Sequence, residues 1–151
     1  MRWTVMGIAA VGGVTALALI RSWLELPGVP SDVSGAVASE HVRVLAEGHD
    51  SNPGNDWDQT YVLLSVTSNG DPVTEIERAL RSAGWITKRT SGNGLVLSGD
   101  MPAERPRYGV AVTTYEGVEC FDGDEICHTF EETARGHDDD GLFVADFMPY
   151  V

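Results

Sequence analysis

The hydrophobic pattern of the chain opens with an uncharged apolar run of 18 residues, from Trp3 to Ile20. In helical form this run is about 27 Å long, which is close to the thickness of a bilayer's hydrocarbon core. Trp3 at its start and Trp23 just beyond its end stand where aromatic side chains favour the membrane interface. The pattern predicts a transmembrane or signal-anchor helix within residues 1–23.

The residues that flank this run predict its orientation and its fate. Arg2 and the terminal amine outweigh Arg21, which is followed by Glu25, so we expect the N-terminus on the cytoplasmic side. A small-x-small cleavage sequence is present at residues 16–18, but cleavage there would leave a strongly apolar new terminus. We therefore expect a single-pass membrane protein with an extracytoplasmic main domain, or a secreted domain if the segment is cleaved.

Residues 24–58 have the composition of a juxtamembrane linker. The stretch begins with two prolines, two glycines and two serines within twelve residues, and it ends in a run rich in Asn, Asp and Gly. Between these parts, the spacing of Val37, Val42 and Leu45 is compatible with a short helix within residues 36–47.

The compact domain is expected to occupy residues 59–151. Its best strand candidate is the β-branched and apolar stretch at 60–67. Asp71 and Pro72 then form a helix start, because Asp caps the first amides and Pro suits the first helical position. Apolar residues recur at helical spacing up to Gly84, which supplies the stop.

The remaining elements are predicted to be strands. Two short extended stretches, 85–90 and 95–98, surround a Gly- and Asn-containing turn and indicate a hairpin. Residues 108–115 alternate as a half-buried strand does, and 142–147 form a last candidate. This order predicts an α+β fold, a small antiparallel-sheet domain with one packed helix.

The helix-to-strand junction at residues 77–85, ERALRSAGW, resembles junctions in uncharacterised secreted or single-pass membrane-anchored proteins of high-GC actinobacteria. The use of nine arginines and one lysine is consistent with that source. The resemblance implies an envelope location and implies no activity and no functional residues.

Acidity is the main chemical feature of the chain. It holds 23 Asp and Glu against 10 Lys and Arg, a net charge of -13, which excludes a nucleic-acid binder because phosphate contacts need clustered bases. Eleven of the acids fall within residues 116–146, with Arg135 as the one base there. Asp122, Asp124 and Glu125 are candidate ligands for calcium, although their spacing departs from the EF-hand pattern. The alternative is a solvated acidic face.

Cys120 and Cys127 are the two cysteines of the chain. In an oxidising compartment, an even number at short spacing predicts a disulfide, worth about 2.5 kcal/mol in the chain-entropy model. A zinc site is disfavoured because the spacing is too long and no second pair exists.

No nucleophile elbow, zinc-protease motif or phosphate-binding loop is present in the sequence. We therefore expect a non-enzymatic, membrane-anchored extracytoplasmic interaction module that binds an envelope protein or component through a sheet edge or through exposed Trp57 and Trp85. Trp57 lies in a polar loop, which favours a contact, whereas the alternative for Trp85 is a place in the core. A weak calcium-binding domain is the alternative, and a hydrolase with an unrecognised site is a third. The spacing of Ala9 and Gly13 would also permit a homodimer through the membrane helices, although such residues are common in these segments.

Overall fold

The computed structural model describes residues 26–51, 57–118, 124–137 and 141–150. The predicted membrane helix, with Trp3, Ile20 and Trp23, lies outside these ranges. Within them, no helix is both long enough and apolar enough to cross a bilayer.

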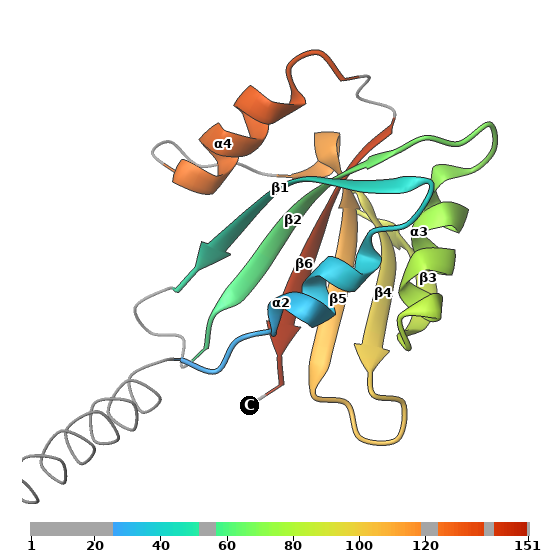
Figure 1. Cartoon of the computed structure of the whole chain (residues 1–151), viewed down its shortest axis with the longest axis vertical. Coiled ribbons are helices and arrows are strands. Elements are labelled where there is room, and N and C mark those ends of the chain that lie inside the picture. Colours follow the sequence, from blue (N-terminus) through green and yellow to red (C-terminus); the bar gives the residue numbers. More distant parts are fainter. Residues whose placement is uncertain (1–25, 52–56, 119–123, 138–140, 151) are drawn as a thin grey trace, which may run out of the picture.

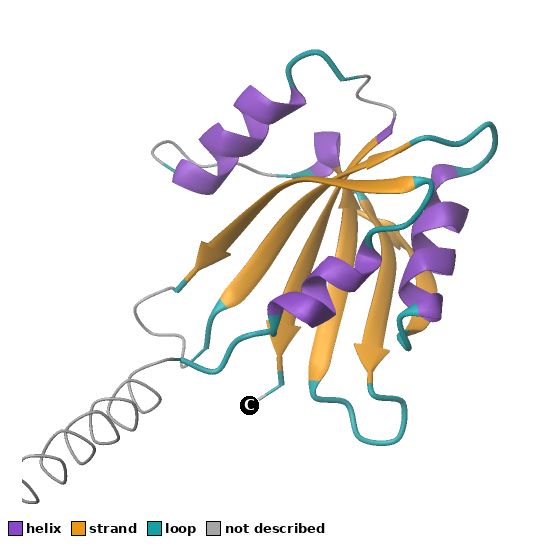
Figure 2. Ribbon diagram, viewed as in Figure 1, coloured by secondary structure: helices purple, strands orange, loops and turns teal. Residues whose placement is uncertain are grey.

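A six-stranded antiparallel sheet forms the centre of the molecule, in the order β1-β2-β6-β5-β4-β3 (Figure 1). This sheet and the helices around it confirm the α+β class (Figure 2). The strands are β1 (Val42–Asp50), β2 (Gln59–Val66), β3 (Ile86–Gly92), β4 (Leu95–Met101), β5 (Tyr108–Thr114) and β6 (Leu142–Pro149). The helices are α2 (Ser31–Ser34), α3 (Pro72–Ser82) and α4 (Glu125–Ala134), with short 3-10 turns η1 (Gly35–Val37) and η2 (Tyr115–Gly117).

Helix α3 packs on one face of the sheet, and the sequence signals at its ends are confirmed. Asp71 accepts a hydrogen bond from Val73 N at 3.1 Å and caps the helix. Ile76 and Leu80 are fully buried in the larger core, which gives α3 its apolar stripe. Gly84 has a φ of 94°, the left-handed conformation in which glycine commonly ends a helix.

Helix α4 packs on the opposite face, within the acidic segment 116–146, where the sequence predicted no helix. Phe130 and Ala134 are buried against Leu63 of β2 and Val144 of β6 in a second core cluster. The many acids lie on the exposed side of this helix and obscure a short apolar stripe. The apolar residues of this stripe recur at helical spacing, and that spacing is the signal in the sequence from which α4 could have been predicted.

The prediction of a short helix within residues 36–47 is wrong. Residues 42–50 form β1, which pairs with β2, so the packed part of the chain includes residues before Gln59. A β-bulge between Val44 and Ala46 interrupts the alternation of the strand. Strand alternation places Val42 in the core on the α3 side and Leu45 in the cluster on the α4 side, and their spacing of three resembles a helical repeat.

Candidate functional site

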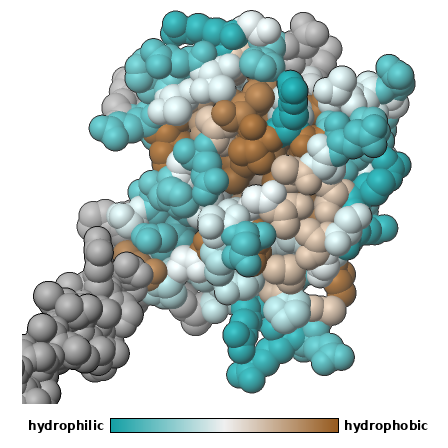
Figure 3. All heavy atoms as spheres, viewed as in Figure 1, coloured by the Kyte–Doolittle hydropathy of each residue, from teal (hydrophilic) through white to brown (hydrophobic). Residues whose placement is uncertain are grey.

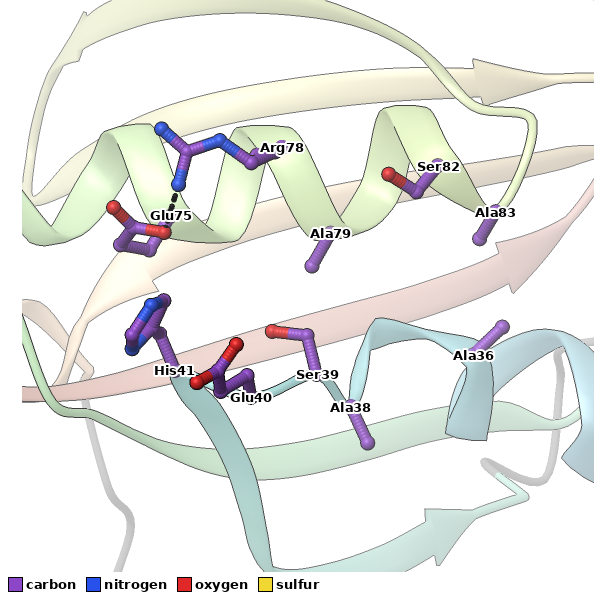
Figure 4. A pocket seen from close by; sticks show the side chains of 10 residues that line it. All are labelled: Ala36, Ala38, Ser39, Glu40, His41, Glu75, Arg78, Ala79, Ser82 and Ala83. Atoms are coloured by element: carbon purple, nitrogen blue, oxygen red, sulfur yellow. Dashed lines mark hydrogen bonds and ion pairs between the residues drawn. The ribbon is translucent and has the colours of Figure 1, made fainter.

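A groove runs along α3, between this helix and residues 36–41 (Figure 4). It consists of two adjoining hollows of about 480 Å³ and 580 Å³. His41 and Glu75 line both hollows and mark the place where they meet. We call this feature the α3 groove.

The α3 wall of the groove follows from the helical repeat. Glu75, Arg78 and Ser82 stand three and four residues apart, which places them on one side of the helix. Arg78 Nη1 forms an ion pair with Glu75 Oε2 (Figure 4). The Glu75 side chain is only 16% exposed, whereas that of Arg78 is 62% exposed. The carboxylate thus lies within the groove and the guanidinium at its rim.

The opposite wall is held by hydrogen bonds at the start of β1. Ser39 N donates to Val42 O at 2.9 Å, and Val42 N donates to Ser39 Oγ at 3.2 Å. Thr67 N donates to His41 O at 2.9 Å, which fixes His41 against β2's end. Side chains on this wall, including Ser39, Glu40 and His41, face the helix across the hollow (Figure 4).

Small side chains keep the groove open. Ala36 on one wall faces the side of Ala79 and Ala83 on the other, and Ala38 lines the same wall as Ala36 with its methyl group directed away from the helix. The space-filling view shows mildly hydrophobic side chains gathered between α2 and α3 (Figure 3). At the other end, residues 67–71 contribute hydroxyl, amide and carboxylate groups. The groove therefore offers a narrow apolar part and a polar part with many hydrogen-bonding groups.

A second polar group lies on the sheet face opposite α3, on β6. Asp146 is half-buried, its Oδ1 has no hydrogen-bond partner in the described part of the chain, and its Oδ2 lies 3.5 Å from Gln59 Nε2. Burial raises the pKa of Asp146 to about 6. The adjacent Tyr61 donates to Gln59 Oε1 at 3.2 Å, and burial, followed by the nearby carboxylates, raises its pKa to about 12.

The candidate calcium ligands are only partly described. Asp124 is the N-cap of α4, where its Oδ1 accepts hydrogen bonds from Ile126 N and Cys127 N. Glu125 is exposed in the first turn, and Asp122 lies outside the described residues. Within the described ranges, no three His, Cys, Asp or Glu side chains are grouped as a metal site would require. Calcium binding by this segment stays a prediction.

The predicted disulfide also involves an undescribed residue. Cys127 is buried on the inner side of α4, whereas Cys120 lies outside the described residues. The pairing of the two cysteines therefore stays a prediction.

Neither tryptophan is an exposed surface contact, and Trp85 takes the core position that was its alternative. Trp85 is 2% exposed and belongs to the larger core, so it is not a contact on the surface. Trp57 is half-buried rather than exposed. Neither of them lines the α3 groove.

Both sheet edges carry features that restrict pairing with another strand. Ser39 satisfies the outward N–H and C=O of Val42 at the start of β1, although Val44 further along is 37% exposed. The other edge, β3, carries exposed Lys88 and a register irregularity between Arg89 and Gly92. Charges and bulges of this kind limit edge-to-edge pairing. The groove is thus a better candidate site than either edge.

The described residues form a small α+β domain with an open groove that has polar and apolar walls. Comparison with family models, curated proteins and solved structures gives no match. We therefore infer the function of the chain from the geometry of this site.

Proposed function

We propose that this chain is a non-enzymatic, membrane-anchored extracytoplasmic interaction module that binds an extended segment of a partner in the α3 groove. The observation that carries this proposal is the continuity of the groove. Two adjoining hollows share His41 and Glu75, so one ligand can occupy both.

The length of the groove suits a short extended peptide. The α3 residues that line it run from Thr74 to Ala83, which corresponds to about 14 Å along a helix axis. An extended chain advances about 3.3 Å per residue, so roughly four residues span this distance. Specific recognition of such a segment needs a few fixed polar groups and pockets for alternate side chains, and the groove supplies both.

The charges of the groove favour a ligand that donates hydrogen bonds. Asp71, Glu40 and Glu75 line the hollows, against Arg78 as the one Lys or Arg. The Glu75 carboxylate is mostly covered, so a donor that reaches it is shielded from water and binds more strongly than it would at an open surface. Backbone N–H groups and amines of a partner meet this requirement.

Photo-cross-linking in the native membrane tests the groove. A photo-reactive amino acid replaces exposed Ala38, and Ser82→Trp fills the facing wall. Ser91→Trp is the matched control, because Ser91 is also an exposed serine but lies on β3 away from the groove. We expect a discrete cross-linked partner that disappears with Ser82→Trp and persists with Ser91→Trp. Equal cross-linking in both variants would contradict the groove as the binding site.

Fractionation of cells tests the proposed location. We expect the chain in the membrane fraction, with the domain accessible to protease only from the extracytoplasmic side. Recovery of the intact chain in the soluble cytosolic fraction would refute membrane anchoring while leaving the groove experiment unaffected.

A further inference from the structure

The start of the described chain lies at one end of the sheet. Asp58, which directly precedes β2, donates its backbone N–H to Pro27 O at 3.0 Å. The strand register places the starts of β2, β3 and β5 and the ends of β1, β4 and β6 at this same end. Residues 26–30 and the C-terminus are also found there (Figure 1). We call this part of the molecule the Leu26 end.

Exposed apolar side chains gather at the Leu26 end. Among the large hydrophobic residues exposed in the described part of the chain are Leu26, Ile86 and Tyr150, which are 39%, 55% and 50% exposed. Ile86 is the first residue of β3, and Tyr150 directly follows β6, so all three belong to this end. The one remaining member of the group, Val44 at 37%, lies in the first half of β1. Their concentration at one end favours contact of this end with an apolar or interfacial phase.

The loop between β4 and β5 projects beyond the strands at this end (Figure 1). Residues 102–107 are all exposed. They carry Arg105 and Arg107 against Glu104, a local charge of +1 in a chain whose net charge is -13. Tyr150 N donates to Arg107 O at 2.7 Å, which holds the end of this loop beside the tyrosine. Arginine and tyrosine side chains with apolar stems and polar tips suit the headgroup layer of a membrane.

The place of the proposed anchor in the sequence brings the Leu26 end close to the bilayer. The apolar run ends at Ile20, so only residues 21–25 join it to Leu26. Five residues reach at most about 18 Å when fully extended. The start of β5 lies two strand spacings from β2, which is about 10 Å. The loop at residues 102–107 can therefore reach the headgroup layer while the anchor spans the bilayer.

The distribution of charge favours the same orientation. Most of the net charge falls within residues 116–146, which include α4, and α4 lies toward the other end of the sheet (Figure 1). At the Leu26 end, the Asp100 carboxylate accepts the Tyr150 hydroxyl at 2.5 Å. Exposed Asp32 and Asp50 belong to α2 and β1 and not to the projecting loop. An anionic membrane surface repels the acidic segment and turns the loop toward the lipid.

We infer that this end of the domain rests on the phospholipid headgroups of the membrane, with Arg105 and Arg107 on lipid phosphates. Guanidinium groups bind phosphate through paired, charge-assisted hydrogen bonds, and the ring of Tyr150 lies at the interface beside them. The inference rests on the proposed membrane anchor, because a chain with a net charge of -13 does not stay at an anionic surface unaided. Since α3 begins at the other end of the sheet, the hollow lined by residues 67–71 then opens away from the membrane.

Quenching by labelled lipid tests this inference on the full chain in nanodiscs. A fluorescent amino acid replaces exposed Ala103 in the projecting loop, and in a control chain it replaces exposed Ser91, near the hairpin turn at the other end of the sheet. The nanodiscs contain phosphatidylcholine, phosphatidylglycerol and a phospholipid that carries a nitroxide on its headgroup. Because the nitroxide quenches only at short range, we expect stronger quenching of the label at Ala103 than of the label at Ser91.

Two double variants with equal charge change separate the arginine contacts from general electrostatics. Arg105→Glu combined with Arg107→Glu is expected to lower the quenching at Ala103 severalfold, since each arginine near an anionic surface is worth about a fivefold change in the contact equilibrium. Arg43→Glu combined with Arg135→Glu, at exposed positions away from the Leu26 end, is expected to change it by less than about twofold. Circular dichroism of each variant checks that the domain is folded.

Co-elution of the chain with the nanodiscs is recorded in the same samples. A chain that does not co-elute would refute the proposed anchor, and this inference with it. A chain that co-elutes but shows equal quenching at Ala103 and Ser91, or equal losses in the two double variants, would overturn the headgroup contact alone and leave the anchor standing.

Discussion

The centroid of the Trp85 indole ring lies 5.6 Å from the centroid of the Phe147 phenyl ring, and the two ring planes are inclined at 59°. The tilted geometry is favourable for aromatic pairs. Trp85 N also donates to Leu80 O at 3.0 Å across the turn made by Gly84. The pair thus connects the end of α3 with β6, a central strand of the sheet, and fixes the helix that forms one wall of the groove.

Loss of this aromatic pair is expected to destabilise the domain. Trp85→Ala removes a fully buried side chain and should lower the free energy of unfolding by about 3–5 kcal/mol. Trp85→Phe should cost less, about 1–2 kcal/mol, because it keeps an aromatic ring, although a smaller one, and removes an indole N–H that has no hydrogen-bond partner in the described structure. Denaturant titration followed by circular dichroism measures both. Trp57→Phe, at a half-buried position, is the control and should change stability least.

The sequence was sufficient for elements whose local signals agree with their packing. Asp71, Pro72 and Gly84 punctuate α3, and its apolar spacing matches the side that the helix buries. Local signals failed where tertiary contacts decide the structure. The spacing of apolar residues on the two faces of β1 imitates a helical repeat, and Phe130 receives its core role only because α4 lies on Leu63.

The carboxyl group of Asp146 makes stability depend on pH in an unusual direction. Its pKa is about 6 in the folded chain because of burial, above its ordinary value of 3.8. Between these values the folded chain binds more protons than the unfolded chain, so the free energy of unfolding falls as the pH rises from about 4 to about 6. Asp146→Asn should remove this fall and stabilise the domain at pH 7 by about 1–3 kcal/mol.

Thermal unfolding at a series of pH values from 3.5 to 7.5 checks this prediction. The difference between Asp146→Asn and the wild type should be small at the acidic end and reach its full size above about pH 6. Glu131→Gln on the exposed side of α4 provides the control and should give no such pH-dependent gain. A constant difference across the range would show that Asp146 does not titrate as its burial requires.

Arg89 connects the edge strand β3 to α3 through two carboxylates. Its Nη1 lies 2.8 Å from Asp71 Oδ2, and its Nε lies 3.0 Å from Glu77 Oε2. The hydrogen bonds from Arg89 are the main reason why the pKa values of Asp71 and Glu77 are lowered. These pairs therefore stabilise the domain at neutral pH, and the stabilisation is lost as the pH falls through the lowered pKa values.

Arg89→Met should lower the melting temperature at pH 7, and the difference from the wild type should shrink at pH 3 and in 1 M salt. Lys88→Met is the matched control, because Lys88 is the neighbouring residue and its side chain lies on the other face of the sheet. If both variants lower the melting temperature by the same amount at every pH and salt concentration, the positive charge on β3 acts generally and not through the two carboxylates.

The candidate site was not predictable from the sequence, because its walls come from segments that local patterns do not relate. Glu75 is visible as a helix residue, but His41 stood within a segment read as a helix in a linker. The two meet only because β1 pairs with β2 and places its first residues beside α3. Asp146 likewise appeared as one of eleven acids, and its half-buried position depends on its neighbours across the sheet.

The packing of α4 on the sheet requires that residue 48, which contacts Ile126, has no side chain. A Cβ added to Gly48 would be 2.8 Å from Ile126 Cγ2 and 2.9 Å from its Cγ1, on a β-branched side chain that has little freedom to move. Gly48→Ala should therefore lower the free energy of unfolding by about 1–3 kcal/mol, the usual cost of overpacking. Gly48 lies in β1, where alanine alone would otherwise be tolerated or favourable.

A double-mutant cycle distinguishes this clash from a backbone effect. Ile126→Ala should itself destabilise the chain by loss of apolar contact, but the Gly48→Ala change in that background should cost about 1 kcal/mol less than in the wild type. Denaturant unfolding of the four chains gives the coupling energy. Purely additive losses would mean that the two residues do not compete for the same space, and that α4 is seated on the sheet by Phe130 and Ala134 alone.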